Sequence, residues 1–337
     1  MKTLIYIGNK LGVRKGANVS SIDVLGELFT ETGFKVYSAS AKKNILMRLL
    51  DMIWTCFKYR KQADYVLIDT YSTRNFYYAY FVSIVCQVLK LKYLPILHGG
   101  KLPERLKRSP KLSKRIFNNA YLNIAPSSFT KSKFEAAGFR NVKCIPNTIE
   151  LNKYEFKQRI FEDVKLLWVR SFSKIYNPLL AVKILKALKD LGVKAELCMV
   201  GPDSDGSLER AKQLANQLEV TVDFTGKLSK ADWIKRSEKY NFFINTTHFD
   251  NMPISVIEAM ALGLPVISTD VGGMPFLIQN KKNGILVKPD SVEAFVKAIQ
   301  YIVDYPEIRK QIIDQARADA KKLDWTVIKN QWINVLE

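Results

Sequence analysis

Two acidic residues with seven residues between them, Asp250 and Glu258, are placed to act together on a phosphorylated ligand. They flank the start of a predicted helix. Pro253 suits its first turn, where a missing N–H costs nothing, and Gly263 suits its end. The first N–H groups of such a helix lack partners and carry the positive end of its dipole. The pattern therefore predicts a phosphate site at residues 250–255, beside two carboxylates.

Short apolar runs alternate with helical stretches along the chain and must position this site. The predicted strands of the first half are Thr3–Gly8, Lys35–Ser38, Tyr65–Asp69, Tyr93–Leu97, Leu122–Ala125 and Val142–Ile145. Those of the second half are 165–169, Ala195–Val200, Val220–Phe224, Phe242–Asn245 and Pro265–Ser268. Continuous apolar strands that alternate with helices form parallel sheets covered on both faces, so the fold class is α/β.

The alternation stops at Pro146, and the chain stays polar through Glu162 before it resumes. We therefore expect two Rossmann-like, doubly wound lobes, over residues 1–155 and 156–320. A C-terminal helix within 321–337 is expected to pack back across their junction. Because ligands bind at the carboxyl ends of the strands in such lobes, two of them predict a cleft between facing lobes.

The composition is that of a folded protein, with 337 residues of which 47% are hydrophobic and 25% charged. Four cysteines without a CxxC pair, and only two histidines, argue against a disulfide framework, a zinc site and a histidine-rich metal centre. The N-terminus is typical of a strand and not of a signal peptide. The longest apolar run, Phe76–Leu89, is shorter than the roughly 20 residues of a membrane span and predicts a buried helix. We expect a cytoplasmic protein.

The net charge of +20 is concentrated in the first half, where residues 1–150 hold 25 Lys and Arg against 9 Asp and Glu. Such a field attracts nucleic acid, anionic lipid or phosphorylated substrates. Two basic segments, Lys42–Lys61 with its Leu, Trp and Phe residues and Lys101–Arg115, favour docking on an anionic membrane. For the first segment, a core-facing helix with a solvated basic side is equally open. No RRM, KH, zinc-finger or helix-turn-helix signature supports nucleic acid as the partner.

The stretch from Asp250 to Glu258, followed by Ala259-Met260-Ala261-x-Gly263-x-Pro265, resembles the retaining family 4 glycosyltransferases of GT-B fold. The signature of this family is a pair of acidic residues separated by seven others. Asp250 stands where glutamate is usual, which keeps the charge but shortens the reach by one methylene. The segments 268–275 and 283–287 are similar to the same family.

The resemblance implies a role for each candidate residue. Arg170 and Lys174 would hold the donor diphosphate, Asp250 would face the sugar and Glu258 the ribose diol. His98 would lie near the reacting sugar. The implied catalytic set is thus Asp250, Glu258, Arg170, Lys174 and His98. The donor-binding set is Gly201, Gly226, Lys227, Leu228, Asn251, Met252, Pro253, Ile254 and Ser255, and the acceptor-side loop holds Gly12 and Gly16.

The resulting prediction is an enzyme that moves a sugar from a nucleotide-diphosphate donor, UDP in preference to GDP, to a glycan or polyprenyl-linked acceptor. Retention of configuration, surface polysaccharide biosynthesis and no required metal or other cofactor are implied by the resemblance. We expect it to associate peripherally with the inner face of the membrane through its basic first lobe. A sugar-nucleotide epimerase or phosphorylase on the same fold is an alternative, and a basic nucleic-acid-binding protein is one of a different class.

Overall fold

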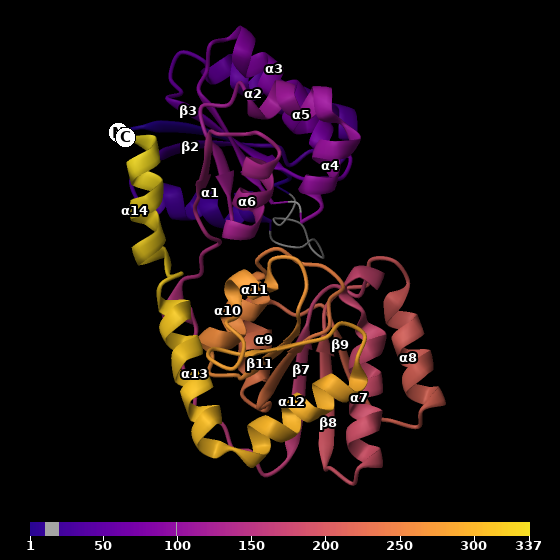
Figure 1. Ribbon diagram of the computed structural model, residues 1–337. Coiled ribbons are helices and arrows are strands. Elements are labelled where there is room, and N and C mark those ends of the chain that lie inside the picture. Colours follow the sequence, from indigo (N-terminus) through magenta and orange to yellow (C-terminus); the bar gives the residue numbers. More distant parts are fainter. Residues whose placement is uncertain (11–19, 99) are drawn as a thin grey trace. The chain divides into compact units, whose positions relative to one another are not determined.

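The computed structural model describes residues 1–10, 20–98 and 100–337, which form two compact units (Figure 1). The first unit consists of Met1–Pro146 together with Val327–Glu337, and the second of Asn147–Thr326. Each unit holds one six-stranded sheet whose neighbouring strands are all parallel. The predicted α/β class with two doubly wound, Rossmann-like lobes is confirmed.

The first sheet has the order β2-β1-β3-β4-β5-β6, which reverses direction between β1 and β3. Its strands are β1 (Thr3–Ile7), β2 (Lys35–Ala39), β3 (Tyr65–Thr70), β4 (Tyr93–Leu97), β5 (Asn123–Ala125) and β6 (Val142–Cys144). Its helices are α1 (Ser21–Glu31), α2 (Ile45–Tyr59), α3 (Phe76–Val88), α4 (Leu102–Arg108), α5 (Pro110–Phe117) and α6 (Ser128–Ala136). Side chains of β1, β3 and β4 are buried throughout, as their apolar sequences predict.

The second sheet has the order β12-β11-β10-β7-β8-β9, which reverses between β7 and β10. Its strands are β7 (Val164–Val169), β8 (Ala195–Val200), β9 (Asp223–Gly226), β10 (Phe242–Asn245), β11 (Val266–Thr269) and β12 (Ile285–Val287). The helices that follow are α7 (Pro178–Asp190), α8 (Ser207–Gln217), α9 (Lys230–Ser237), α10 (Ile254–Ala261), α11 (Met274–Leu277), α12 (Val292–Asp304), α13 (Pro306–Lys321) and α14 (Trp325–Leu336).

Helices cover both faces of the second sheet, and alternate residues of β7 show why. Leu166 and Trp168 are buried in one cluster with side chains of α7 and α12. Leu167 points the other way, into a second cluster with side chains of α9 and α10. Because successive strand residues face opposite sides, a strand that is apolar at every position needs cover on both. The run Leu166-Leu167-Trp168 therefore places β7 in the middle of the unit.

The chain leaves the first unit earlier than expected, at Pro146 and not at residue 155. The polar stretch that follows is held on the second unit by specific contacts. Tyr154 is buried and bonds to α10, and Arg159 donates hydrogen bonds to the carbonyls of Ser237 and Leu262, both at 2.8 Å. Polarity alone therefore did not mark the boundary, because these side chains are held by hydrogen bonds within the second unit.

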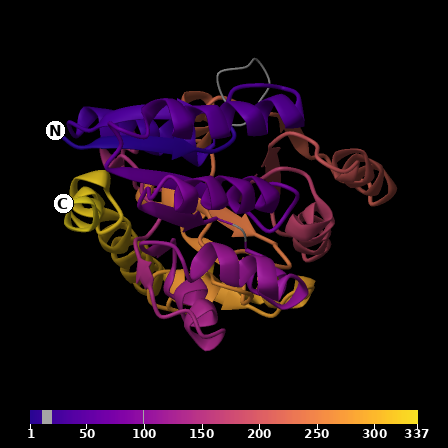
Figure 2. The same cartoon turned by 90° about the horizontal axis from the view of Figure 1, so that it is seen from above.

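The last helix, α14, begins in the second unit, but its residues from Val327 onward belong to the first. Trp332 is buried there and packs perpendicular to the ring of Phe29 of α1, at 5.2 Å between ring centres. Both chain ends accordingly lie on one side of the first unit (Figure 1 and Figure 2).

Candidate functional site

The carboxyl edge of the second sheet gathers the loops that follow its central strands. In doubly wound sheets, ligands bind at this edge where the strand order reverses, which here is between β7 and β10. Arg170 directly follows β7. Gly201, after β8, donates its N–H to the carbonyl of Gly226 at 2.9 Å. Gly273, after β11, donates to the carbonyl of Asp250 at 2.9 Å. The chain after β8 is thus tied to the end of β9, and the loop after β11 to the loop after β10.

Arg170 and Asp250 form an ion pair at this edge, and each side chain is only 15% exposed. The guanidinium of Arg170 also lies over the ring of Tyr176, 4.5 Å from its centre. Burial lowers the pKa of Arg170 below its ordinary value. Asp250 Oδ1 accepts a hydrogen bond from the N–H of Asn251 at 2.9 Å. A cation and a carboxylate therefore lie together at the strand ends, largely shielded from solvent.

Glu258 of α10 is buried and oriented by two donors. The hydroxyl of Tyr154 donates to Oε1 at 2.6 Å, and Nζ of Lys230 donates to the same oxygen. Within the described residues, the hydrogen bonds recorded for Glu258 thus converge on one carboxylate oxygen, Oε1. Burial raises the pKa of the Tyr154 hydroxyl far above its ordinary value, and the negative charge of Glu258 raises it further. Tyr154 therefore stays protonated and remains a donor.

Close backbone packing at the site requires glycine at two positions. A Cβ at Gly273 would overlap the carbonyl of Asn251, and a Cβ at Gly201 would overlap the carbonyl of Arg170. No ordinary side chain is compatible with contacts this short. The backbone positions of Arg170 and of the loop at Asn251 therefore depend on these glycines.

Helix α10 begins at Ile254, one residue later than predicted, because Pro253 has an extended ψ of 124° and caps the helix from outside. The loop before it is fixed by a hydrogen bond from Nδ2 of Asn147 to the carbonyl of Met252, at 2.8 Å. The hydroxyl oxygen of Ser255 is buried and has no hydrogen-bond partner among the described residues. The start of α10 therefore offers backbone N–H groups and one hydroxyl to an anionic ligand.

Lys174 lies at the rim of this edge with an exposed side chain, at the start of a short 3-10 helix, Lys174–Tyr176. Its backbone N–H donates to Oδ2 of Asp205 at 2.9 Å, and Ser173 Oγ lies 3.2 Å from the same oxygen. The Lys174 amide is the main reason that the pKa of Asp205 falls to about 2. His248 shares the rim, with its N–H donating to the carbonyl of Ile175 at 2.7 Å.

The remaining predicted donor loop follows β9. Gly226 ends the strand with a φ of +68°, Lys227 is exposed, and Leu228 packs against the apolar cluster under α10. Ser229 then caps α9 by accepting the N–H of Asp232 at 3.2 Å. This cap sets the start of α9 and so the position of Lys230, which reaches Glu258.

In the first unit, His98 follows β4 and is tied to Asp69 of β3. Nε2 of His98 lies 2.8 Å from Oδ1 of Asp69, and the Tyr6 hydroxyl donates to that oxygen at 3.0 Å. The ring of Tyr71 stacks on the imidazole at 5.5 Å between centres. Asp69 is buried, and its Oδ2 has no hydrogen-bond partner within the described residues. These groups lie where the order of the first sheet reverses, between β1 and β3.

The structure thus brings together Arg170, Asp250, Glu258 and the start of α10, and it places Lys174 at their rim. His98 belongs to the other unit. The predicted acceptor-side glycines, Gly12 and Gly16, lie outside the described residues.

Three residues at these sites were missed by the sequence analysis. A signal for Asp69 exists, because it is a charged residue at the end of a fully apolar strand and such residues face a site or a partner. No comparable signal exists for Tyr154 and Lys230, which come from a polar linker and an exposed helix start and reach Glu258 only in the folded unit.

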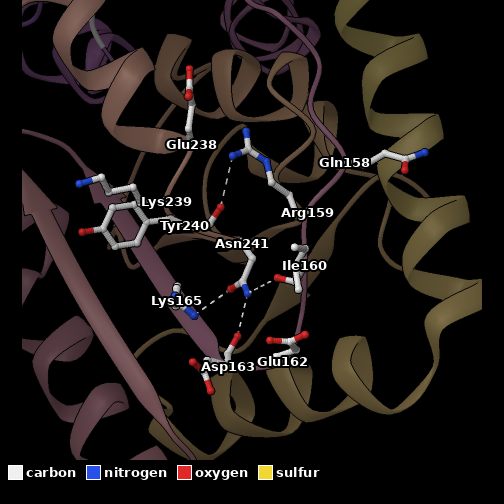
Figure 3. A pocket seen from close by; sticks show the side chains of 10 residues that line it. All are labelled: Gln158, Arg159, Ile160, Glu162, Asp163, Lys165, Glu238, Lys239, Tyr240 and Asn241. Carbon is white, nitrogen blue, oxygen red and sulfur yellow. Dashed lines mark hydrogen bonds between the residues drawn. The ribbon is translucent and has the colours of Figure 1, made fainter.

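A cavity of about 330 Å³ lies away from this site, at the amino ends of β7 and β10. Figure 3 shows Asn241 at its centre, donating through Nδ2 to the carbonyls of Ile160 and Asp163, both at 2.7 Å. Its Oδ1 accepts the N–H of Lys165 at 2.8 Å. The polar groups here are used to hold the chain before β7 against the sheet, so the cavity is not the predicted site.

The described residues hold neither a candidate metal cluster nor a candidate membrane span. No group of three or more His, Cys, Asp and Glu side chains is placed to hold a metal ion there. Nor does any helix within the described ranges have the length and apolar character needed to span a membrane.

Residues 152–319, which include the whole Arg170, Asp250 and Glu258 cluster, match the family model described as glycosyl transferases group 1. This segment belongs to that family. The chain therefore carries a group 1 glycosyltransferase domain, and the resemblance noted in the sequence is confirmed at that level.

Individual proteins agree with the assignment to group 1 glycosyltransferases. The chain is 23% identical over 256 residues to the putative teichuronic acid biosynthesis glycosyltransferase TuaC of Bacillus subtilis, covering 71% of this chain and 64% of that protein. The chain covers a smaller part of two other relatives. It matches 36% of the length of an uncharacterized glycosyltransferase of Haemophilus influenzae and 30% of that of the sulfoquinovosyl transferase SQD2 of Arabidopsis thaliana.

Two solved structures share the fold over the whole chain. Sucrose-phosphate synthase from Thermosynechococcus elongatus superposes with a TM-score of 0.82 at 17% identity, covering 99% of this chain and 98% of the other. Anabaena Alr3699/HepE in complex with UDP and glucose superposes with a TM-score of 0.78 at 18% identity, covering 100% and 99%.

Proposed function

We propose that the protein is a nucleotide-sugar-dependent glycosyltransferase whose donor binds at the carboxyl edge of the second sheet. The observation that carries the proposal is the cluster of Arg170, Asp250 and Glu258 beside the start of α10, inside the segment that belongs to the group 1 glycosyltransferases. UDP is the preferred nucleotide in this proposal, because HepE, a protein of the same fold, was crystallised with UDP and glucose.

The chemistry suits these side chains. Cleavage of a sugar–diphosphate bond leaves negative charge on the departing diphosphate. Arg170, Lys174 and the N–H groups at the start of α10 would stabilise this charge, and the unpaired hydroxyl of Ser255 adds a fourth donor. No metal is needed in this scheme. Retention of configuration, as in family 4, would follow from attack on the face of the sugar that the diphosphate leaves.

The two carboxylates would take different parts of the donor. Oε1 of Glu258 accepts hydrogen bonds from Tyr154 and Lys230, so Oε2 would accept those from the ribose hydroxyls. Asp250 would accept a hydrogen bond from a hydroxyl of the sugar once the diphosphate draws Arg170 away from the Asp250 carboxylate. Gly201 and the loop of Gly226, Lys227 and Leu228 would line the nucleotide, and His98 would face the reacting sugar.

The acceptor in this proposal is a glycan, carried on a polyprenyl lipid, and the pathway is surface polysaccharide assembly. The relative TuaC, named for teichuronic acid biosynthesis, supports the pathway. The basic first unit supports a lipid-linked acceptor at the inner face of the membrane, with the protein in the cytoplasm and bound peripherally.

The test is a thermal-shift screen of nucleotide sugars, since a ligand that binds only the folded state raises the melting temperature. We expect UDP and UDP-sugars to raise it, and GDP-sugars to raise it less. The hit is then incubated with the protein alone. Rapid release of free sugar without any acceptor would favour a sugar-nucleotide epimerase over a transferase.

A further inference from the structure

Helix α2 has two apolar faces, and only one of them is used by the fold. Met52 and Cys56 are buried against the core of the first unit, together with Thr55 and the stem of Arg48. The sequence left open whether the apolar residues of this segment face the core. They do so only in part, because a second set points to solvent.

The exposed face of α2 consists of Leu46, Met47, Leu50, Trp54 and Phe57. Leu46 is 70% exposed, Leu50 59% and Trp54 61%. With 3.6 residues per turn, the five side chains fall within about 100° of the helix circumference, opposite Met52 and Thr55. Trp54 and Phe57 stack on each other at 6.3 Å between ring centres. This continuous apolar strip has no role in the core of the unit.

Helix α3, the neighbour of α2, carries exposed apolar side chains of its own. It packs beside α2 in the first unit (Figure 1). The hydroxyl of Tyr78 donates to the carbonyl of Ile45 at 3.4 Å. Its Tyr77, Phe81 and Val88 are exposed and lie on one side of the helix. Soluble proteins rarely leave so many large apolar side chains exposed together unless they bind something there.

Cations flank both ends of the strip. Lys42 and Lys43 precede α2, and Arg48 holds them in place by donating to the carbonyls of Lys42 at 2.8 Å and Lys43 at 3.0 Å. Lys58 and Lys61 follow the strip at its other end. In the described part of the chain, none of these lysines is paired with a carboxylate.

We infer that the outer face of α2, together with the exposed apolar side chains of α3, is a docking surface for an anionic lipid bilayer. The helix has 15 residues, or about 22 Å, which is less than the about 30 Å of a bilayer core, so it would lie in the plane of the interface. Apolar side chains would enter the acyl region, and the lysines would meet lipid phosphates. Nucleic acid fits less well, because it offers no partner for a strip of Leu and Met.

The inference rests on the proposed function only for its purpose, which is to bring the enzyme to a lipid-linked acceptor. Its test measures vesicle binding and needs no sugar transfer. A protein that binds UDP but ignores vesicles would therefore overturn the surface and leave the donor site intact.

The first measurement uses Trp54 as a reporter. The other four tryptophans are buried, at Trp168, Trp233, Trp325 and Trp332. Vesicles of equal parts phosphatidylglycerol and phosphatidylcholine should shift the emission to the blue, and acyl-chain-brominated lipid should quench it. Trp54→Phe should abolish both effects. Phosphatidylcholine alone, or high salt, should weaken them. An unchanged wild-type spectrum with anionic vesicles would contradict the inference.

The second measurement compares two exposed-residue variants by vesicle flotation. In the first, Leu46, Leu50, Trp54 and Phe57 are all replaced by Gln, and binding should fall by at least about tenfold. The control replaces Ile160 and Leu191 by Gln. These two residues are comparably exposed but belong to the second unit, so this variant should float like wild type. Equal flotation of all three proteins overturns the inference. The inference is also overturned if the wild-type protein is a dimer and the only effect of the four Gln substitutions is to make it a monomer. The strip would then bind a second copy of the chain.

Discussion

The hydroxyl of Tyr154 donates a 2.6 Å hydrogen bond to Oε1 of Glu258, joining the segment that enters the second unit to the helix at its ligand edge. Tyr154 and Glu258 are 104 residues apart and both are buried. Lys230 donates to the same oxygen. The carboxylate that we assign to the ribose is therefore held by the protein through this oxygen.

Removing this hydroxyl with Tyr154→Phe should loosen Glu258 without creating a cavity. Hydrogen bonds to charged groups contribute about 1.5–3 kcal/mol, so we expect a loss of that order in the free energy of unfolding, and UDP affinity lower by roughly tenfold. Urea unfolding and calorimetric titration measure the two effects. Tyr240→Phe is the matched control. It is a buried tyrosine of the same unit, so it should cost stability but leave UDP affinity unchanged. Unaltered affinity in Tyr154→Phe would remove its positioning role.

The pairing of Arg170 with Asp250 predicts different effects for two substitutions at position 250. Asp250→Asn leaves the mostly buried guanidinium without its partner and should lower turnover by about 100-fold or more. Asp250→Glu keeps the charge, has the side chain usual in the family and should retain far more activity. Steady-state kinetics with the nucleotide sugar found by the screen decide between them, with circular dichroism to verify the fold. Near-normal turnover in Asp250→Asn would show that Asp250 is not part of the reacting site.

The Asp69 carboxylate should act on turnover through His98, because its Oδ1 lies 2.8 Å from Nε2 of the imidazole. Asp69→Asn keeps the shape but removes the charge that orients the ring and favours one tautomer. We expect kcat to fall and its pH profile to change, whereas UDP affinity stays the same, because the proposed nucleotide contacts belong to the second unit. His98→Gln should give a similar fall in kcat, and the double variant no larger one. Additive effects of the two changes would mean that they act independently.

The low pKa of Asp205 predicts how its contribution to stability changes with pH. Hydrogen bonds from Lys174 N–H, and then from Ser207, lower this pKa from 3.8 to about 2. The folded state therefore favours the ionised form. Its stabilising effect is present above about pH 4 and is lost as the pH falls towards 2. Asp205→Asn should lower the melting temperature at pH 7, and the difference from wild type should shrink below pH 4. A difference that does not change with pH would exclude ionisation as its cause.

Sequence patterns predicted most strands of both sheets, because parallel strands buried on both faces are apolar at every position, as in Leu166-Leu167-Trp168. The short strand β12 was missed, and β9 begins three residues later than predicted. The acidic pair and the helix that holds Glu258 were also visible, because Pro253 and Gly263 flank this helix and mark its ends through their backbone geometry alone. What escaped were contacts between distant segments. The bond from Tyr154 to Glu258 and the packing of Gly273 against Asn251 depend on how the loops meet, which no local pattern records. The exposure of Trp54 was not predicted for the same reason, since the sequence does not show whether an apolar residue of a helix faces the core or the solvent.

The central claim is that a nucleotide binds at the carboxyl edge of the second sheet, and calorimetric titration of UDP tests it most directly. Three proteins are compared: wild type, Glu258→Gln, and Glu307→Gln, which changes an exposed glutamate in the first turn of α13. We predict that wild type and Glu307→Gln bind one UDP with equal affinity, and that Glu258→Gln binds about tenfold or more weakly through loss of its ribose contact. Equal UDP affinity in all three proteins, or no binding by wild type, would contradict the account.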